Sequence, residues 1–185
     1  MASLIGYYSL VFGLCASLLI VFFCIKNFQN SLIFDNKVLT FTFLQLFFVI
    51  ISFLGLIISF INSDFSNETV FNHSHTTKPL FYKISGTWGN HEGSMLLWLC
   101  ILSIFSFFFS FTKNIEDNFQ KLTLIIQAFL HTLFGLFIVF TSNPFLVNSI
   151  LVNEGLGLNP ILQDPGLAVH PPILYAGYVL SLIHI

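Results

Sequence analysis

The residue whose type and setting could do chemistry most directly is His170, within LNPILQDPGLAVHPPILYAGY at positions 158–178. Two prolines follow it at once, and an apolar run begins there. Pro171 is expected to hold His170 extended, and Pro172 suits the first turn of a helix. A neutral imidazole at such a helix entrance can serve as an axial ligand of haem iron. A structural histidine bonded to a loop carbonyl explains the same residues as well.

The segment just before His170 carries a turn signal. Asp164, Pro165 and Gly166 follow one another, with proline and glycine in the second and third places of a turn. The sequence therefore predicts a tight turn at 164–166 and an irregular loop that continues to the histidine.

A second stretch, FYKISGTWGNHEGSMLLW at 81–98, gathers aromatic, imidazole and carboxylate side chains among glycines. Its residues of interest are Trp88, Gly89, His91, Glu92 and Gly93. Glycine lets a backbone turn tightly or approach a planar ligand closely. Because tryptophan favours the depth at which a membrane meets water, a membrane-interface belt is the alternative interpretation.

Composition defines the class of protein that must position these residues. Of 185 residues, 56% are hydrophobic and 8% are charged. A soluble domain carries roughly a quarter charged residues. The net charge of −2 gives no indication of nucleic-acid binding. The chain is therefore expected to be an integral membrane protein with the lipid bilayer as its solvent.

Four apolar runs are long enough to cross that bilayer, namely Leu4–Ile25, Val38–Ile61, Ser94–Phe111 and Leu122–Thr141. A hydrocarbon core of ~30 Å needs about 20 helical residues. A fifth run, Pro172–Ile185, has 14 residues and is expected to be a helix cut off before its end. The fold class predicted is an all-α polytopic membrane protein with four complete transmembrane helices and the truncated start of a fifth.

These runs divide the chain into five parts: helices one and two (1–61), a loop (62–93), helices three and four (94–141), a loop (142–171) and the start of helix five (172–185). Residues 62–79 are expected to form an exposed, mobile connector. Four of the six lysines lie in the two short loops: Lys26, Lys37, Lys113 and Lys121. By the positive-inside rule, both long loops then face the outer compartment.

One histidine falls inside a predicted span. His131 lies near the middle of the fourth apolar run. An ionisable residue at that depth is by default a functional hypothesis. A neutral imidazole hydrogen-bonded to a neighbouring helix, through Thr132 or Gln127, is the alternative interpretation.

Together with TSNPF at 141–145, the two stretches at 81–98 and 158–178 resemble the N-terminal part of the CcmF family. These are the large haem-lyase subunits of bacterial and mitochondrial cytochrome c maturation. The resemblance covers most of the chain from Pro79 onward. It implies haem handling on the outer face of an energy-transducing membrane, with haem b as cofactor and His170 as a candidate axial ligand of the haem iron. It gives no role to the other motif residues, which are Trp88, Gly89, His91, Glu92, Gly93, Asp164, Pro165, Gly166, Pro171 and Pro172.

The resemblance also implies partners. These are a haem chaperone, an apocytochrome c that receives the haem, and the remainder of the haem-lyase subunit on the same or a separate chain. The family's tryptophan-rich WWD segment and second flanking histidine are absent from these 185 residues. A fragment or a split gene would explain this, and in either case the chain alone is expected to be an incomplete enzyme. The phenylalanine-rich, arginine-free composition favours a mitochondrial inner membrane over a bacterial one.

A different class of function stays open at this point. The chain could be a structural or proton-pathway subunit of a respiratory membrane complex. Such a subunit should carry acids or lysines within its membrane spans, and all Asp, Glu and Lys residues lie outside the four predicted runs. A scaffold that no longer binds haem is a third possibility.

Overall fold

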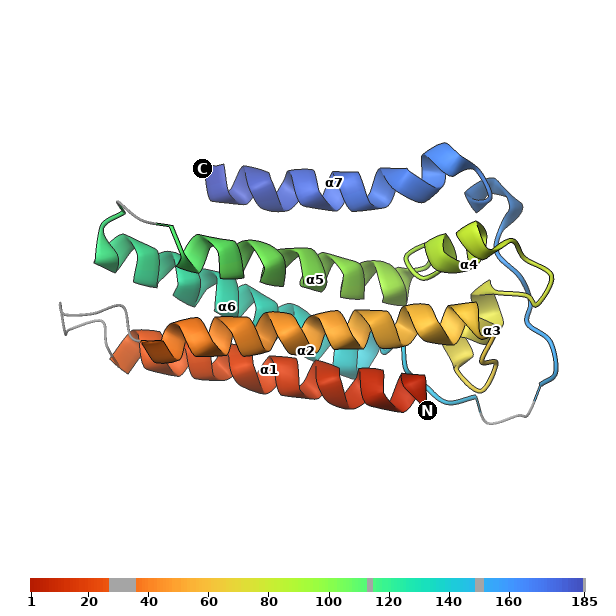
Figure 1. Cartoon of the computed structure of the whole chain (residues 1–185), viewed down its shortest axis with the longest axis horizontal. Helices are drawn as coiled ribbons and strands as arrows, with labels where there is room; N and C mark the ends of the chain where they lie inside the picture. Colours follow the sequence, from red (N-terminus) through yellow and green to blue (C-terminus); the bar gives the residue numbers. More distant parts are fainter. Residues whose placement is uncertain (27–35, 113–114, 149–151, 185) are drawn as a thin grey trace.

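The computed structural model describes residues 1–26, 36–112, 115–148 and 152–184, and it is helical throughout these ranges apart from connecting segments. Four long helices run side by side (Figure 1): α1 (Ala2–Lys26), α2 (Asn36–Ile61), α5 (His91–Ser110) and α6 (Asp117–Thr141). Among the described residues, these four are long and apolar enough to cross a membrane. The four predicted spans and the all-α polytopic class are confirmed.

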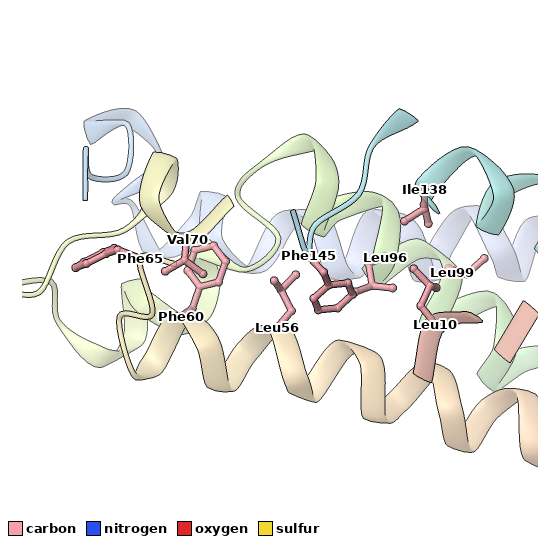
Figure 2. Packing of buried hydrophobic residues seen from close by; sticks show 9 residues of the cluster. All are labelled: Leu10, Leu56, Phe60, Phe65, Val70, Leu96, Leu99, Ile138 and Phe145. Carbon is pink, nitrogen blue, oxygen red and sulfur yellow. The ribbon is translucent and has the colours of Figure 1, made fainter. Parts of the chain in front are cut away.

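The four long helices form a bundle in which α1 and α5 each pack against both α2 and α6. One end of its core joins residues from α1, α2, α5 and α6 with residues of the connecting segments. Figure 2 shows this cluster, which comprises Leu10, Leu56, Phe60, Phe65, Val70, Leu96, Leu99, Ile138 and Phe145. Many large apolar side chains remain on the outside of the bundle, as expected of helices that face lipid.

The connector after α2 packs against the end of the bundle, so the expectation of an exposed segment at 62–79 is wrong, whereas its mobility stays a prediction. It contains the short helix α3 (Glu68–His73) and leads into α4 (Leu80–Gly86). The side chain of Asn67 is buried and caps α3 by accepting a hydrogen bond from the Val70 N–H at 3.0 Å. It also donates to the Pro144 carbonyl at 2.9 Å, which ties the connector to the chain after α6.

Both long connecting regions meet at one end of the bundle, which we call the loop end. The Glu68 N–H donates to the Leu146 carbonyl at 2.9 Å, and the Leu156 N–H donates to the Phe71 carbonyl at 2.8 Å. Both long loops therefore lie at the same end of the helices. The compartment that they face stays a prediction from the lysines, one of which, Lys113, lies outside the described residues.

One contact between these regions should depend on pH. Glu154 accepts hydrogen bonds from the Thr76 hydroxyl at 2.6 Å and the Thr76 N–H at 2.9 Å. The hydroxyl bond, then the backbone bond, lowers the pKa of Glu154 below its ordinary value of 4.5. A lowered folded-state pKa stabilises the contact above pH 4.5, and this stabilisation is lost as the pH falls through the folded value.

We therefore expect the Thr76 amide to exchange its hydrogen faster, relative to the intrinsic rate, as the pH falls below 4.5. Hydrogen exchange followed residue by residue measures this. Glu154→Gln is the matched control, because the amide cannot titrate in this range. Thr76 protection that falls equally in both proteins would contradict the assignment.

The last helix, α7 (Pro165–His184), begins seven residues before the predicted start at Pro172. The predicted turn at 164–166 is wrong, because Asp164 caps this helix instead. Its Oδ1 accepts from the N–H groups of Gly166 at 2.8 Å and Leu167 at 3.1 Å. Pro165 then occupies the first helical position, where a missing N–H is harmless. The 20-residue helix lies along α5, on the side away from α1 (Figure 1).

Candidate functional site

The two sequence blocks that could do chemistry come together at the loop end. An open cleft of about 370 Å³ lies between the corner that joins α4 to α5 and the first turns of α7. Its walls include Trp88, Gly89, His91, Met95, Pro171 and Tyr175. The cleft is thus formed by segments about 80 residues apart in the chain, and aromatic and apolar side chains supply much of its surface.

One hydrogen bond joins the two blocks directly. The Trp88 indole N–H donates to the Ala168 carbonyl at 2.7 Å. In a regular helix that carbonyl would accept from the residue four positions later, which here is Pro172 and has no N–H. Proline therefore frees a carbonyl that tryptophan then uses. The Trp88 ring also stacks on Phe53 of α2, with ring centroids 6.4 Å apart, so it connects α2 to α7.

This bond predicts a measurable coupling between Trp88 and Pro172. Trp88→Phe should lower the free energy of unfolding by about 1–2 kcal/mol, because a half-buried carbonyl loses its donor. In a Pro172→Ala background the new alanine N–H can satisfy the same carbonyl, so Trp88→Phe should be less damaging there. Thermal unfolding of the four proteins in one detergent gives the coupling energy. Strictly additive effects would contradict the coupling between Trp88 and Pro172 through this carbonyl.

The WGNHEG block is held in shape by its own asparagine. Asn90 is buried, and its Oδ1 accepts from the Gly93 N–H at 2.7 Å, which caps α5. Its Nδ2 donates to the Gly86 carbonyl at 2.8 Å, which fixes the corner to α4. Gly93 itself lies against the Thr87 backbone, so closely that a Cβ atom there would overlap the Thr87 carbonyl. The glycine allows this close approach of two backbone segments.

His91 and Glu92 connect this block to the end of α6. The His91 Nδ1 and the Ser142 hydroxyl are 2.6 Å apart and share a hydrogen bond. Glu92 lines a small polar cavity of about 80 Å³ together with Glu68 and His73. Burial lowers the pKa of His73, although the Glu92 carboxylate acts in the opposite direction. The TSNPF segment is therefore part of the same loop-end structure.

His170 lies in the second turn of α7 and not at a helix entrance, so its expected extended conformation is wrong. Its side chain is exposed and is not among the residues that line the cleft. Ile173, Leu174 and Gly177 follow it at helical spacing and are exposed as well. We call these four residues the outward stripe of α7. Trp88 and Pro171 line the cleft, whereas His170 is exposed outside it.

Two contributors to the site are not apparent from the sequence. Ala168 acts through its carbonyl, and Ser142 acts through its bond to His91. Pro172 was a usable signal for the first, because a proline inside a helix always leaves a carbonyl four residues earlier without a helical donor. Asp164, Pro165 and Gly166 start α7 and do not line the cleft.

Fold and site together define a polytopic helical membrane protein with a cleft between its last helix and a tryptophan-containing corner. A family model described as "Cytochrome C assembly protein" matches residues 88–185, more than half of the chain, and the chain belongs to this family. The resemblance predicted from the motifs is thereby confirmed. Membership gives no support to the alternative of a respiratory proton-pathway subunit.

Bacterial relatives and a solved structure agree with this assignment. The chain is 52% identical over 136 residues to the cytochrome c-type biogenesis protein CycK of Bradyrhizobium diazoefficiens, covering 73% of this chain and 21% of that protein. It is 41% identical over 176 residues to the ccl1 protein of Rhodobacter capsulatus, covering 94% of this chain and 27% of that one. The structure of a "Cytochrome c Heme Lyase CcmF" shares the fold, with a TM-score of 0.80 and 23% identity over 97% of this chain and 28% of that chain. The chain thus spans about a quarter of the length of these proteins.

Proposed function

We propose that this chain handles haem in cytochrome c maturation, as the N-terminal portion of a haem-lyase subunit that positions haem for attachment to apocytochrome c. The relatives named as cytochrome c biogenesis proteins support this. The observation that carries the proposal is the hydrogen bond from Trp88 to the Ala168 carbonyl. This bond joins the two family blocks into one site. Its acceptor, Ala168, lies two residues before His170, the candidate ligand.

The residues present fit a haem group. In this proposal His170 is an axial ligand, and its exposed imidazole is accessible to an iron atom outside the bundle. Ile173 and Leu174 offer apolar contact to a porphyrin, and the space beside Gly177 is open. The haem, as haem b before attachment, supplies the iron and porphyrin chemistry, and this chain binds and orients it.

A second axial ligand would come from elsewhere in the assembly. His91 is bonded to Ser142 on the cleft side, and His131 is fully buried inside the bundle. Neither lies on the outward stripe of α7. The proposal therefore includes the remainder of the haem-lyase subunit as a partner, along with a haem chaperone that delivers haem and an apocytochrome c that accepts it.

The membrane in this proposal is an energy-transducing inner membrane. The curated relatives are bacterial and favour a bacterial inner membrane. The mitochondrial inner membrane suggested by the sequence rests on composition alone.

A chimera tests the proposed function. In the Rhodobacter ccl1 protein, the matched segment is replaced by the corresponding segment of this chain, which is 94% of its length, and the gene is returned to a strain that lacks ccl1. We expect covalent haem on c-type cytochromes to be restored, as measured by haem staining of gels. Deletion of the segment is the negative control. A chimera present at normal membrane levels that attaches no haem would refute the proposal.

A further inference from the structure

Polar side chains occur at regular spacing in the interior of the four-helix bundle. On α2, Gln45, Ser52 and Ser59 are seven residues apart and are each 1% exposed or less. Seven residues make about two helical turns, so the three lie on one face. On the facing helices the buried polar residues include Ser103 and Ser106 of α5 and Gln120, Gln127 and His131 of α6. Several helices therefore turn polar groups inward, within the predicted membrane spans.

Ring contacts between the helices place part of this set at one depth. The rings of Phe43 and Phe107 are 5.9 Å apart, which brings Gln45 level with Ser106. The rings of Trp98 and Phe134 are 4.1 Å apart. Because α5 and α6 run in opposite directions, Gln127 is then also level with Ser106, and His131 lies one turn closer to the loop end. We call Gln45, Ser106, Gln127 and His131 the polar layer.

The polar layer differs from its surroundings in its hydrogen bonding. Among the described residues, six of its buried side-chain atoms have no partner within the protein: both amide atoms of Gln45, the Ser106 hydroxyl, the Gln127 Oε1 and both ring nitrogens of His131. Of the neighbouring polar groups that the structure describes, the Ser52 hydroxyl of α2 also has no partner, whereas others are satisfied. The Ser17 and Thr132 hydroxyls are 2.8 Å apart, and Ser103 donates to the Leu99 carbonyl at 2.9 Å.

Atoms of this kind rarely stay without partners. An unsatisfied buried donor or acceptor is destabilising, and the hydrocarbon around a membrane bundle offers neither. We propose that the polar layer binds ordered water molecules inside the bundle, with Gln45, Gln127 and His131 as their principal ligands. At roughly three hydrogen bonds for each buried water, six atoms correspond to about two molecules.

Water matches the chemistry of these atoms better than an ion does. The set includes a donor and an acceptor on Gln45, an acceptor on Gln127, a hydroxyl on Ser106 and the two nitrogens of a neutral imidazole. A water molecule donates and accepts, so it can bridge such a mixed set. A bound cation would call for several oxygen ligands with carboxylate charge, and the polar layer contains no carboxylate. The inference concerns the bundle interior and does not depend on haem binding at α7.

Solid-state NMR of the whole chain in lipid nanodiscs tests the proposal. Magnetisation is transferred from water protons to ¹⁵N-labelled side chains. We expect clear transfer to the His131 ring and the Gln45 amide, well above that to the backbone of Leu10 in the hydrophobic cluster, which is the dry core in this comparison. The proposal is overturned if transfer to the polar layer equals that of the dry core, or if the His131 and Gln45 nitrogens prove directly hydrogen-bonded to protein atoms.

Two serines of α5 provide a matched pair for the same experiment. Ser106→Ala removes a hydroxyl that has no protein partner, and Ser103→Ala removes one that is already bonded to Leu99. Loss of one of roughly three bonds to a water should lower the transfer to Gln45 about twofold in Ser106→Ala. Ser103→Ala should leave it unchanged. Equal responses to the two substitutions would contradict a water site at Ser106.

Discussion

His170→Ala in the ccl1 chimera should lower the yield of covalently attached haem at least about tenfold, which corresponds to about 1.4 kcal/mol of lost stabilisation. The imidazole is exposed on α7, so its removal takes away the candidate iron ligand without opening a cavity in the bundle. The amount of chimera in the membrane should therefore stay the same. Haem staining of the cytochromes, with immunoblots of the chimera, measures both quantities.

His75→Ala is the matched control for this prediction. His75 is another partly exposed histidine at the loop end, and its contacts are with Thr77 and Glu154. We expect the chimera with His75→Ala to attach haem normally. Pro171→Ala keeps the His170 imidazole and supplies an N–H to the helix, so its effect should be smaller than that of His170→Ala. If His170 only braces the structure, the alanine variant should instead reduce the amount of protein.

Gly93→Ala should destabilise the chain by about 3 kcal/mol or more, because the new methyl group would overlap the Thr87 carbonyl. The Thr87 carbonyl belongs to the backbone, so it cannot rotate out of the way as the end of a flexible side chain could. The overlap can be removed in two ways. Either the Asn90 side chain releases its hydrogen bond to the start of α5, or the corner that joins α4 to α5 moves away from α4. Thermal unfolding in detergent, followed by far-UV circular dichroism, measures the loss.

Gly177→Ala separates this steric effect from the general effect of adding a methyl group. Gly177 also lies in a helix, and a Cβ atom there would meet no atom within 4 Å. Alanine is the better helix former, so the change should be neutral or slightly stabilising. A Gly93→Ala protein as stable as Gly177→Ala would mean that the corner is not packed as described.

The sequence predicts the four spans well because each rests on a long apolar run, a signal that survives errors of several residues. The residues at which these helices begin are harder to predict. α5 begins at His91, ahead of the predicted Ser94, because Asn90 caps it. α6 begins at Asp117, ahead of the predicted Leu122, because its first turn is polar and contributes nothing to an apolar run.

The sequence mispredicts the region around His170 for a physical reason. Aspartate followed by proline and glycine fits a tight turn and a helix start equally, and only the hydrogen bonds to Asp164 distinguish them. Two adjacent prolines argue against a helix that continues through 171–172, although proline is tolerated in a first turn. The helix tolerates them with the help of a donor from Trp88, some 80 positions away in the sequence. A single sequence does not reveal that contact.

The proposal that His170 ligates haem iron is tested most directly by haem binding to purified chimera that carries His170→Ala, before and after addition of imidazole. We expect the variant to lose haem during purification and to regain it in imidazole, since the free ligand can enter the vacated coordination position. Absorption spectra in the Soret region measure the bound haem and report its axial ligation. A His170→Ala protein that retains haem with an unchanged spectrum would contradict the proposal.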